Sequence, residues 1–175
     1  ILATGSMPLM LPIEGAALPG VVSFRTVADV QAMQKAAATV GHAIVIGGGL
    51  LGLEAAYGLR RCGMDVTVLH LMPHLMERQL DPVAGGMLRK DLARRGIDVI
   101  TNATAEAILG SNHVESVILT DGRELAASLV VMAIGIRPNI ELALSCGLSV
   151  NRGIEIDDRL ATNDSAISAI GECVE

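Results

Sequence analysis

The stretch VIGGGLLGLEAAYGLRRCG, residues 45–63, places three consecutive glycines directly after an apolar run. The run HAIVI predicts a buried strand at 42–46, and the apolar spacing after the glycines predicts a helix that stops at Gly63. A further apolar segment predicts a second strand at 64–70. A glycine-rich turn between a strand and a helix is therefore the feature from which the rest of the fold follows.

The turn fits the pattern G-x-G-x-x-G, in the strand–turn–helix context that dinucleotide-binding sites require. Gly47 allows a sharp turn, Gly49 leaves room for a pyrophosphate, and Gly52 lets the helix lie close to the strand. The free N–H groups and the positive dipole end of the helix would face the phosphates. The predicted cofactor-binding residues of the turn are Gly47, Gly48, Gly49, Leu50, Leu51 and Gly52. The alternative is a tight turn with a purely structural role.

The end of the second predicted strand is the position that usually reads the adenosine ribose, where a carboxylate favours NAD and a basic group favours NADP. His70 occupies this position, and Arg78 follows nearby. A neutral imidazole donates one hydrogen bond to a ribose hydroxyl, whereas a protonated one pairs with a phosphate. His70 is therefore a predicted cofactor-binding residue that leaves NAD and NADP both open, and an unspecific strand-end residue is the alternative.

Glu54 is an isolated charge in an otherwise apolar part of the predicted helix. We place it in the first helical turn, where a carboxylate stabilises the helix dipole by about 0.3–1 kcal/mol. A lone charge beside a dinucleotide site also favours a contact with the nicotinamide half of the cofactor. We prefer this functional interpretation and keep helix stabilisation as the alternative.

The rest of the chain predicts an α/β fold. Glycines and prolines mark residues 5–20 as an extended connector, and strands are expected in ILAT at the start and in AISAI near the end. Two more helices are expected at 27–39 and 81–95, and a short helix at 140–147. A third strand is expected at 97–101 and a buried strand at 128–134. Short strands around the hairpin signal Asp121–Gly122 complete the pattern. We therefore predict a Rossmann-like domain with a parallel sheet and a small antiparallel meander.

The composition excludes several classes of function. Half of the residues are hydrophobic (51%) and 18% are charged, which argues against disorder. The net charge of −6, without a cluster of Lys and Arg, argues against nucleic-acid binding. No apolar run reaches the roughly 18 residues that a membrane span needs, and no signal peptide is recognisable. We expect no membrane association.

The cysteines and histidines do not suggest a metal site. Cys62, Cys146 and Cys173 are widely spaced, and we expect them to be reduced core residues of a cytoplasmic protein. The four histidines show no spacing typical of metal ligands, and no side chain is needed as a catalytic nucleophile. The predicted site therefore contains binding residues only.

Five stretches together resemble the FAD-dependent pyridine-nucleotide reductases: ILATGS, VIGGGLLGLEAA, VTVLHLMPHLMERQLD, VVMAIGIRPN and AIGECVE. Within this family the chain is most similar to the flavin module of NAD(P)H-dependent nitrite reductase large subunits. The resemblance implies an FAD domain that is interrupted by an inserted NAD(P)-binding domain. It places the exit from the FAD domain in residues 1–25, the NAD(P) domain in 26–160 and the return segment in 161–175.

The resemblance also implies roles for individual residues. Thr4 in ATGS, and Gly171 and Glu172 in GEC, correspond to FAD-binding positions of the parent protein. Glu54 and the backbone of Gly135 correspond to positions near the nicotinamide ring. The implied reaction passes a hydride from NAD(P)H to FAD, and siroheme and iron–sulfur centres would lie outside this chain.

Two departures from the family limit what this chain does alone. It holds one dinucleotide fingerprint, so we expect a piece of a longer protein that does not retain FAD by itself. It also lacks an active-site disulfide motif. The expected partners are NAD(P)H and the missing FAD-domain and reductase segments. The alternatives are a ferredoxin or rubredoxin reductase, a nitrate reductase electron-transfer subunit, or a non-catalytic nucleotide-sensing module.

Overall fold

The computed structural model describes residues 1–39 and 41–175, which form two compact units. The central unit comprises Met10–Ile134, and the terminal unit comprises Ile1–Leu9 together with Gly135–Glu175. This division differs from the expected NAD(P) domain of 26–160. The connector after residue 9 packs on the central sheet, whereas the chain after residue 134 packs with the N-terminal segment.

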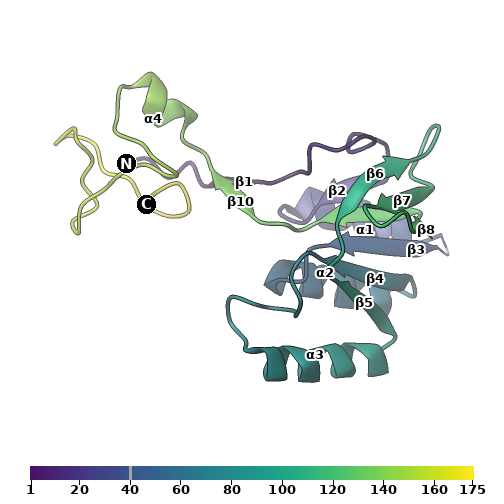
Figure 1. The fold of residues 1–175 in the computed structure, drawn as a ribbon. Helices are drawn as coiled ribbons and strands as arrows, with labels where there is room; N and C mark the ends of the chain where they lie inside the picture. The colour runs from purple at the N-terminus through teal and green to yellow at the C-terminus, as the bar shows by residue number, and fades with distance from the viewer. Residues whose placement is uncertain (40) are drawn as a thin grey trace. The chain divides into compact units, whose positions relative to one another are not determined.

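The central unit is built on a five-stranded parallel sheet, which confirms the predicted fold class. In spatial order its strands are β2 (Val21–Ser23), β9 (Leu129–Met132), β3 (His42–Ile46), β4 (Asp65–His70) and β5 (Ile97–Thr101). Figure 1 shows β3, β4 and β5 side by side in this order. The predicted bounds of β3 and β5 are confirmed, since glycine or polar residues end both apolar runs.

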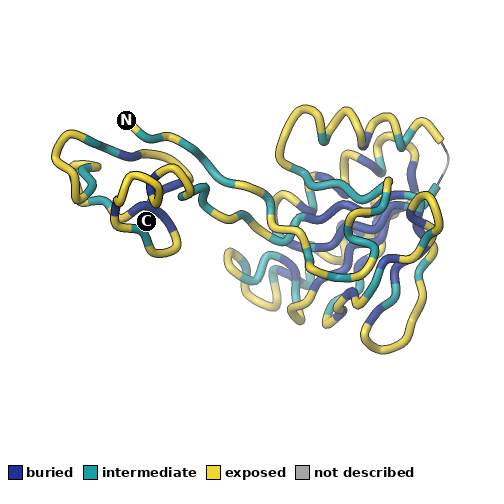
Figure 2. The backbone as a smooth tube through the Cα atoms, turned by 90° about the horizontal axis from the view of Figure 1, so that it is seen from above, coloured by how far each residue is buried: buried dark blue, intermediate teal, exposed yellow. Residues whose placement is uncertain are grey.

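Three helices pack on one face of this sheet: α1 (Val27–Ala37), α2 (Leu50–Arg61) and α3 (Pro82–Arg94). Alternating side chains of each strand point to opposite faces. Ala43 and Val45 of β3 accordingly pack with the helices, whereas Ile44 and Ile46 pack on the other side. Figure 2 shows the strands as the most continuously buried part of the central unit.

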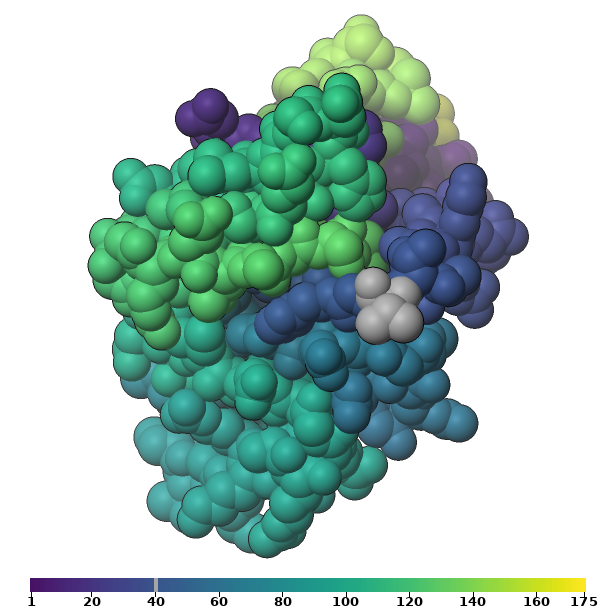
Figure 3. Space-filling model, turned by 90° about the vertical axis from the view of Figure 1, so that its right-hand side faces the viewer, coloured from purple at the N-terminus to yellow at the C-terminus, as the bar shows by residue number. Residues whose placement is uncertain are grey.

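The opposite face of the sheet is covered by a small antiparallel sheet, which confirms the predicted meander. Its strands are β6 (Ala105–Leu109), β7 (Ser116–Leu119) and β8 (Glu124–Ala126). The Asp121–Gly122 hairpin joins β7 to β8, where the Leu119 N–H donates to the Arg123 carbonyl (2.8 Å). In Figure 3 this meander forms a contiguous green layer next to the blue and teal residues of the larger sheet and its helices.

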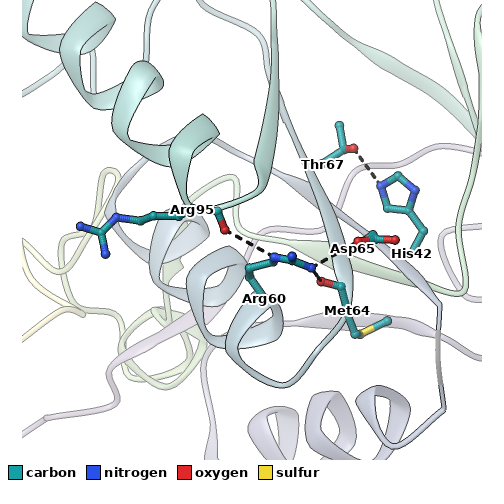
Figure 4. A network of polar contacts seen from close by, with 6 residues as sticks. All are labelled: His42, Arg60, Met64, Asp65, Thr67 and Arg95. Carbon is teal, nitrogen blue, oxygen red and sulfur yellow. Dashed lines mark hydrogen bonds and ion pairs between the residues drawn. The ribbon is translucent and has the colours of Figure 1, made fainter.

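The amino end of the parallel sheet is held by a polar network around Arg60 (Figure 4). The Arg60 guanidinium donates to the carbonyls of Met64 (3.1 Å) and Arg95 (3.4 Å) and pairs with Asp65 (3.2 Å). At the same end His42 Nε2 lies 2.8 Å from the Thr67 hydroxyl. These contacts satisfy carbonyls near the ends of α2 and α3, so this end of the sheet has a structural role.

The terminal unit is small and contains little regular structure. Its elements are β1 (Ser6–Pro8), which pairs antiparallel with β10 (Ile136–Pro138), and α4 (Glu141–Ser145). The strands expected in ILAT and AISAI are wrong, because Leu2 and Ala169 form only an isolated bridge. A buried cluster that includes Ala143, Ile154 and Cys173 holds the unit together.

The expected burial of the cysteines is wrong in two of three cases. Cys62 and Cys146 directly follow α2 and α4 and are exposed, whereas Cys173 is buried; all three are free. No helix in the described ranges combines the length and apolar character needed to traverse a bilayer.

Candidate functional site

The glycine-rich turn lies at the carboxyl end of β3, between β9 on one side and β4 on the other. The chain proceeds from β3 through α2 to β4 and then β5, whereas β9 and β2 lie on the opposite side of β3. The connections therefore diverge at β3, and ligands of parallel α/β sheets bind outside the carboxyl ends of strands at such a point.

Two glycines of the turn are required by close backbone contacts. Gly47 has φ +121°, and a Cβ atom there would collide with the Ala133 carbonyl oxygen of the segment after β9. A Cβ atom on Gly52 would collide with the Gly47 carbonyl oxygen. The first turn of α2 thus lies directly against the end of β3, which leaves no room for a side chain at either position.

Gly49 differs, because the space beside it is open. No heavy atom beyond its chain neighbours lies within 4 Å of the position that its Cβ would take. Gly49 is the N-cap of α2 and offers no side chain to the helix. Within the described residues, no acceptor binds the N–H groups of Gly49, Leu50 or Leu51. These amides and the positive end of α2 can therefore bind an anion that approaches over Gly49.

His70 lies beneath this turn instead of pointing into the crevice. Its side chain is 8% exposed, and its Nδ1 accepts a hydrogen bond from the Gly48 N–H (3.1 Å). Its Nε2 lies 3.0 Å from both the His74 carbonyl and the Glu77 carboxylate. The structure thus brings His70 together with the glycine turn, but with both ring nitrogens bonded inside the protein.

Glu54 is exposed and forms no hydrogen bond or ion pair with the described residues. Its expected place in the first turn of α2 is wrong, because the helix begins at Leu50 and its first turn carries no acidic residue. The N-cap is Gly49 and not a later residue, so Glu54 lies beyond the first turn. Stabilisation of the helix dipole is therefore a weaker explanation of Glu54, whereas its carboxylate is accessible to a ligand.

The remaining predicted residues belong to the terminal unit. The Thr4 hydroxyl donates to the Asn139 carbonyl (2.6 Å), and the Ser6 hydroxyl donates to the Glu172 carboxylate (2.9 Å). Gly171 and Gly135 have φ values of +86° and +127°. The N-terminal segment and the GEC segment are therefore neighbours, as hydrogen bonds between Leu2 and residues 168 and 170 also show.

The sequence argument missed the loop that follows β4. The Met76 N–H donates to the Gly48 carbonyl (3.0 Å), Leu75 is fully buried, and Glu77 contacts His70. The only available signal was the string HLMPHLMERQLD, which carries part of the family resemblance. In the described ranges, no group of three or more His, Cys, Asp or Glu side chains is arranged to hold a metal ion.

The fold and the turn define a class: α/β proteins whose glycine-rich βαβ turn is typical of dinucleotide binding. A family model described as pyridine nucleotide-disulphide oxidoreductase matches residues 1–175. The chain therefore belongs to the pyridine nucleotide-disulphide oxidoreductase family.

Individual relatives agree with this family. The NAD(P)H nitrite reductase of Bacillus subtilis (strain 168) is 50% identical over 100% of this chain and 22% of its own length. The assimilatory nitrate reductase electron transfer subunit of the same organism is 46% identical over 100% of this chain and 23% of its own length. The crystal structure of a ferredoxin reductase from Rhodopseudomonas palustris superposes with a TM-score of 0.94 at 36% identity, covering 99% of this chain and 43% of that one. The chain thus spans less than a quarter of the two curated relatives.

Proposed function

We propose that this chain is the NAD(P)H-binding part of a larger flavin-dependent oxidoreductase. The observation that carries the proposal is the open backbone cradle at Gly49, where unbonded amides meet a helix N-terminus and no side chain fills the space. A pyrophosphate needs this combination of close approach, N–H donors and positive dipole. The family membership of the whole chain supports the same conclusion.

The residues of the cradle bind and orient, and none performs covalent chemistry. The N–H groups of Gly49, Leu50 and Leu51 would hold the two phosphates, while Gly47 and Gly52 keep the turn against the sheet. When bound, the nicotinamide ring supplies the hydride and the flavin accepts it. The protein contributes position and electrostatics to this transfer.

Two further residues are proposed to face the nicotinamide half of the cofactor: the exposed carboxylate of Glu54 and the backbone of Gly135. In the longer protein, Thr4, Gly171 and Glu172 would contact FAD. Their support is the pairing of the N-terminal and GEC segments inside the terminal unit, where Ser6 already donates to Glu172. We further propose that the protein acts in the cytoplasm.

Among electron acceptors we favour nitrite reduction through siroheme and iron–sulfur centres outside this chain, because a nitrite reductase is 50% identical. A nitrate reductase electron-transfer subunit is the second candidate, supported by 46% identity over the whole chain. A rubredoxin or ferredoxin reductase is the third. The remaining alternative is a nucleotide-sensing module, which would bind the nucleotide without reducing flavin in the longer protein.

The proposal is tested by titrating NADH and NADPH into the chain by calorimetry, for the natural sequence and for Gly49→Val. The backbone at Gly49 is extended and a Cβ atom there has no neighbour within 4 Å, so we expect valine to be accommodated but to fill the space that the pyrophosphate needs. We expect at least a tenfold loss of affinity, about 1.4 kcal/mol. Gly58→Val, in open space on the same helix, is the matched control. Equal affinity of the natural chain and Gly49→Val would refute the site.

A further inference from the structure

Both sides of Gly48 are held by the segment that ends β4 and leads to α3. The Gly48 N–H donates to His70 Nδ1 (3.1 Å), and the Gly48 carbonyl accepts from the Met76 N–H (3.0 Å). The Gly48 carbonyl and the Gly49 N–H belong to one planar trans peptide, so they point in opposite directions. Fixing the carbonyl toward Met76 therefore aims the Gly49 N–H away from the loop that holds it.

The imidazole of His70 is itself fixed. Because Nδ1 accepts from Gly48, Nε2 carries the ring hydrogen and donates to the His74 carbonyl and the Glu77 carboxylate, each at 3.0 Å. The His70 side chain is 8% exposed, and the Glu77 side chain is 27% exposed. A carboxylate on the outer nitrogen keeps the inner nitrogen available as an acceptor, as second-shell carboxylates do for other functional histidines.

The packing of the ring also explains a glycine that the dinucleotide pattern leaves unrestricted. A Cβ atom on Gly48 would lie 2.7 Å from His70 Cγ and 2.5 Å from Leu75 Cδ2. Gly48 is therefore glycine because His70 and Leu75 pack against it. Its amide points to the imidazole, which leaves the phosphates to the amides of the residues that follow.

We propose that His70 is a positioning residue, which holds the glycine-rich turn in its nucleotide-binding conformation by accepting the hydrogen bond of Gly48, with Glu77 fixing the required tautomer. This inference rests on the proposed NAD(P)H site. This positioning role takes the place of the direct contact between His70 and the ribose that the sequence predicts. It also makes nucleotide affinity depend on one buried hydrogen-bond acceptor.

Two substitutions separate this role from general packing. His70→Asn keeps an acceptor, because the amide oxygen takes the place of Nδ1. His70→Leu fills the space without an acceptor. His42→Asn is the matched control, because it changes another partly buried histidine of the same sheet at its amino end. Affinity for NADH is measured by calorimetry, and folding is checked by circular dichroism.

We expect His42→Asn to bind NADH as tightly as the natural chain, and His70→Asn to bind within about threefold of it, because the asparagine keeps the acceptor. His70→Leu should bind about tenfold more weakly, the effect of leaving a buried donor unpaired. If His70→Leu does not fold, the affinity of His70→Asn decides alone.

The outcomes separate the two proposals. A natural chain that does not bind NADH overturns the proposed function and this inference with it. A natural chain that binds NADH, together with a folded His70→Asn variant that binds at least about tenfold more weakly, overturns the positioning role alone. Undiminished affinity in a folded His70→Leu variant does the same.

Discussion

The first turns of α2 and α3 show how one side chain distinguishes a capped helix start from the proposed anion site. Both helices follow strands of the same parallel sheet. At α3 the N-cap Asp81 accepts from the Ala84 N–H (2.8 Å), and Pro82 in the first turn has no N–H to offer. At α2 the N-cap is Gly49, which leaves its amides and the space above them open. A helix that satisfies its own amides has none left for a ligand.

The start of α1 in the central unit is capped by side chains of the chain itself, as the start of α3 is. At α1 the Thr26 hydroxyl accepts from the Asp29 N–H (3.2 Å), and the Asp29 carboxylate accepts from the Thr26 N–H (2.8 Å). This reciprocal capping box closes the helix end. Two of the three helices on this face of the sheet are thus capped by their own side chains, and the uncapped one follows the glycine-rich turn.

Of the substitutions that test this comparison of α2 and α3, Gly52→Ala is expected to have the largest effect. The new methyl group would collide with the Gly47 carbonyl oxygen, so α2 must move away from β3. We expect the free energy of unfolding to fall by about 2–4 kcal/mol and NADH binding to be lost with it. Urea denaturation measures the first effect and calorimetry the second.

Gly58→Ala is the control for this substitution, because it adds the same methyl group to the same helix in open space. Alanine is preferred over glycine inside a helix, so this variant should gain up to about 1 kcal/mol. Equal stability of the two variants would show that α2 does not need its close contact with the turn.

Gly49→Asp converts the start of α2 into a copy of the start of α3. The backbone at Gly49 (φ −85°, ψ −175°) already resembles that at Asp81 (φ −75°, ψ 168°), and the space is open. We expect the stability to change by only a few tenths of a kcal/mol, because aspartate and glycine both serve as N-caps. NADH affinity should fall at least tenfold, since a carboxylate competes for the amides and repels the phosphates. If calorimetry finds undiminished NADH affinity in this variant, the amides at the start of α2 do not bind the phosphates.

The smallest effect is expected at α1. Burial opposes ionisation of Asp29, but the hydrogen bonds from Thr26, Arg25 and Ser23 outweigh it, so the pKa of Asp29 lies below its ordinary value. A carboxylate with a lowered pKa stabilises the fold above its unfolded pKa, about 3.9, and this stability is lost as the pH falls through the folded pKa.

Asp29→Asn tests this contribution. The variant should be about 0.5 kcal/mol less stable than the natural chain at pH 7. Urea denaturation at decreasing pH should show the difference shrinking below about pH 4, where the natural carboxylate becomes protonated. NADH affinity at pH 7 should not change, because α1 does not contribute amides to the cradle. A stability difference that is independent of pH would contradict the role of the charge.

The sequence predicted the βαβαβ core because its signals are local. The apolar run HAIVI between two glycines defined β3, the segment IDVIT after Gly96 defined β5, and the glycine pattern located the turn. The three-residue strands β1, β2 and β10 were missed, because each exists only through pairing with a distant segment. His70 was expected to face the ribose of the cofactor, since no local pattern shows that the loop at Met76 folds back over Gly48. Contacts with residues distant in the sequence determine these strands and the position of His70.

The close packing of the His70 ring on Gly48 has a consequence for how related chains are compared and engineered. Positions 48 and 70 should vary together: a residue larger than glycine at position 48 needs a smaller neighbour at position 70 or 75. Anyone who transplants the segment after β4 from a homologue, in order to alter nucleotide preference, should therefore exchange position 48 in the same step. The glycine-rich turn and the loop after β4 should therefore be exchanged as one unit.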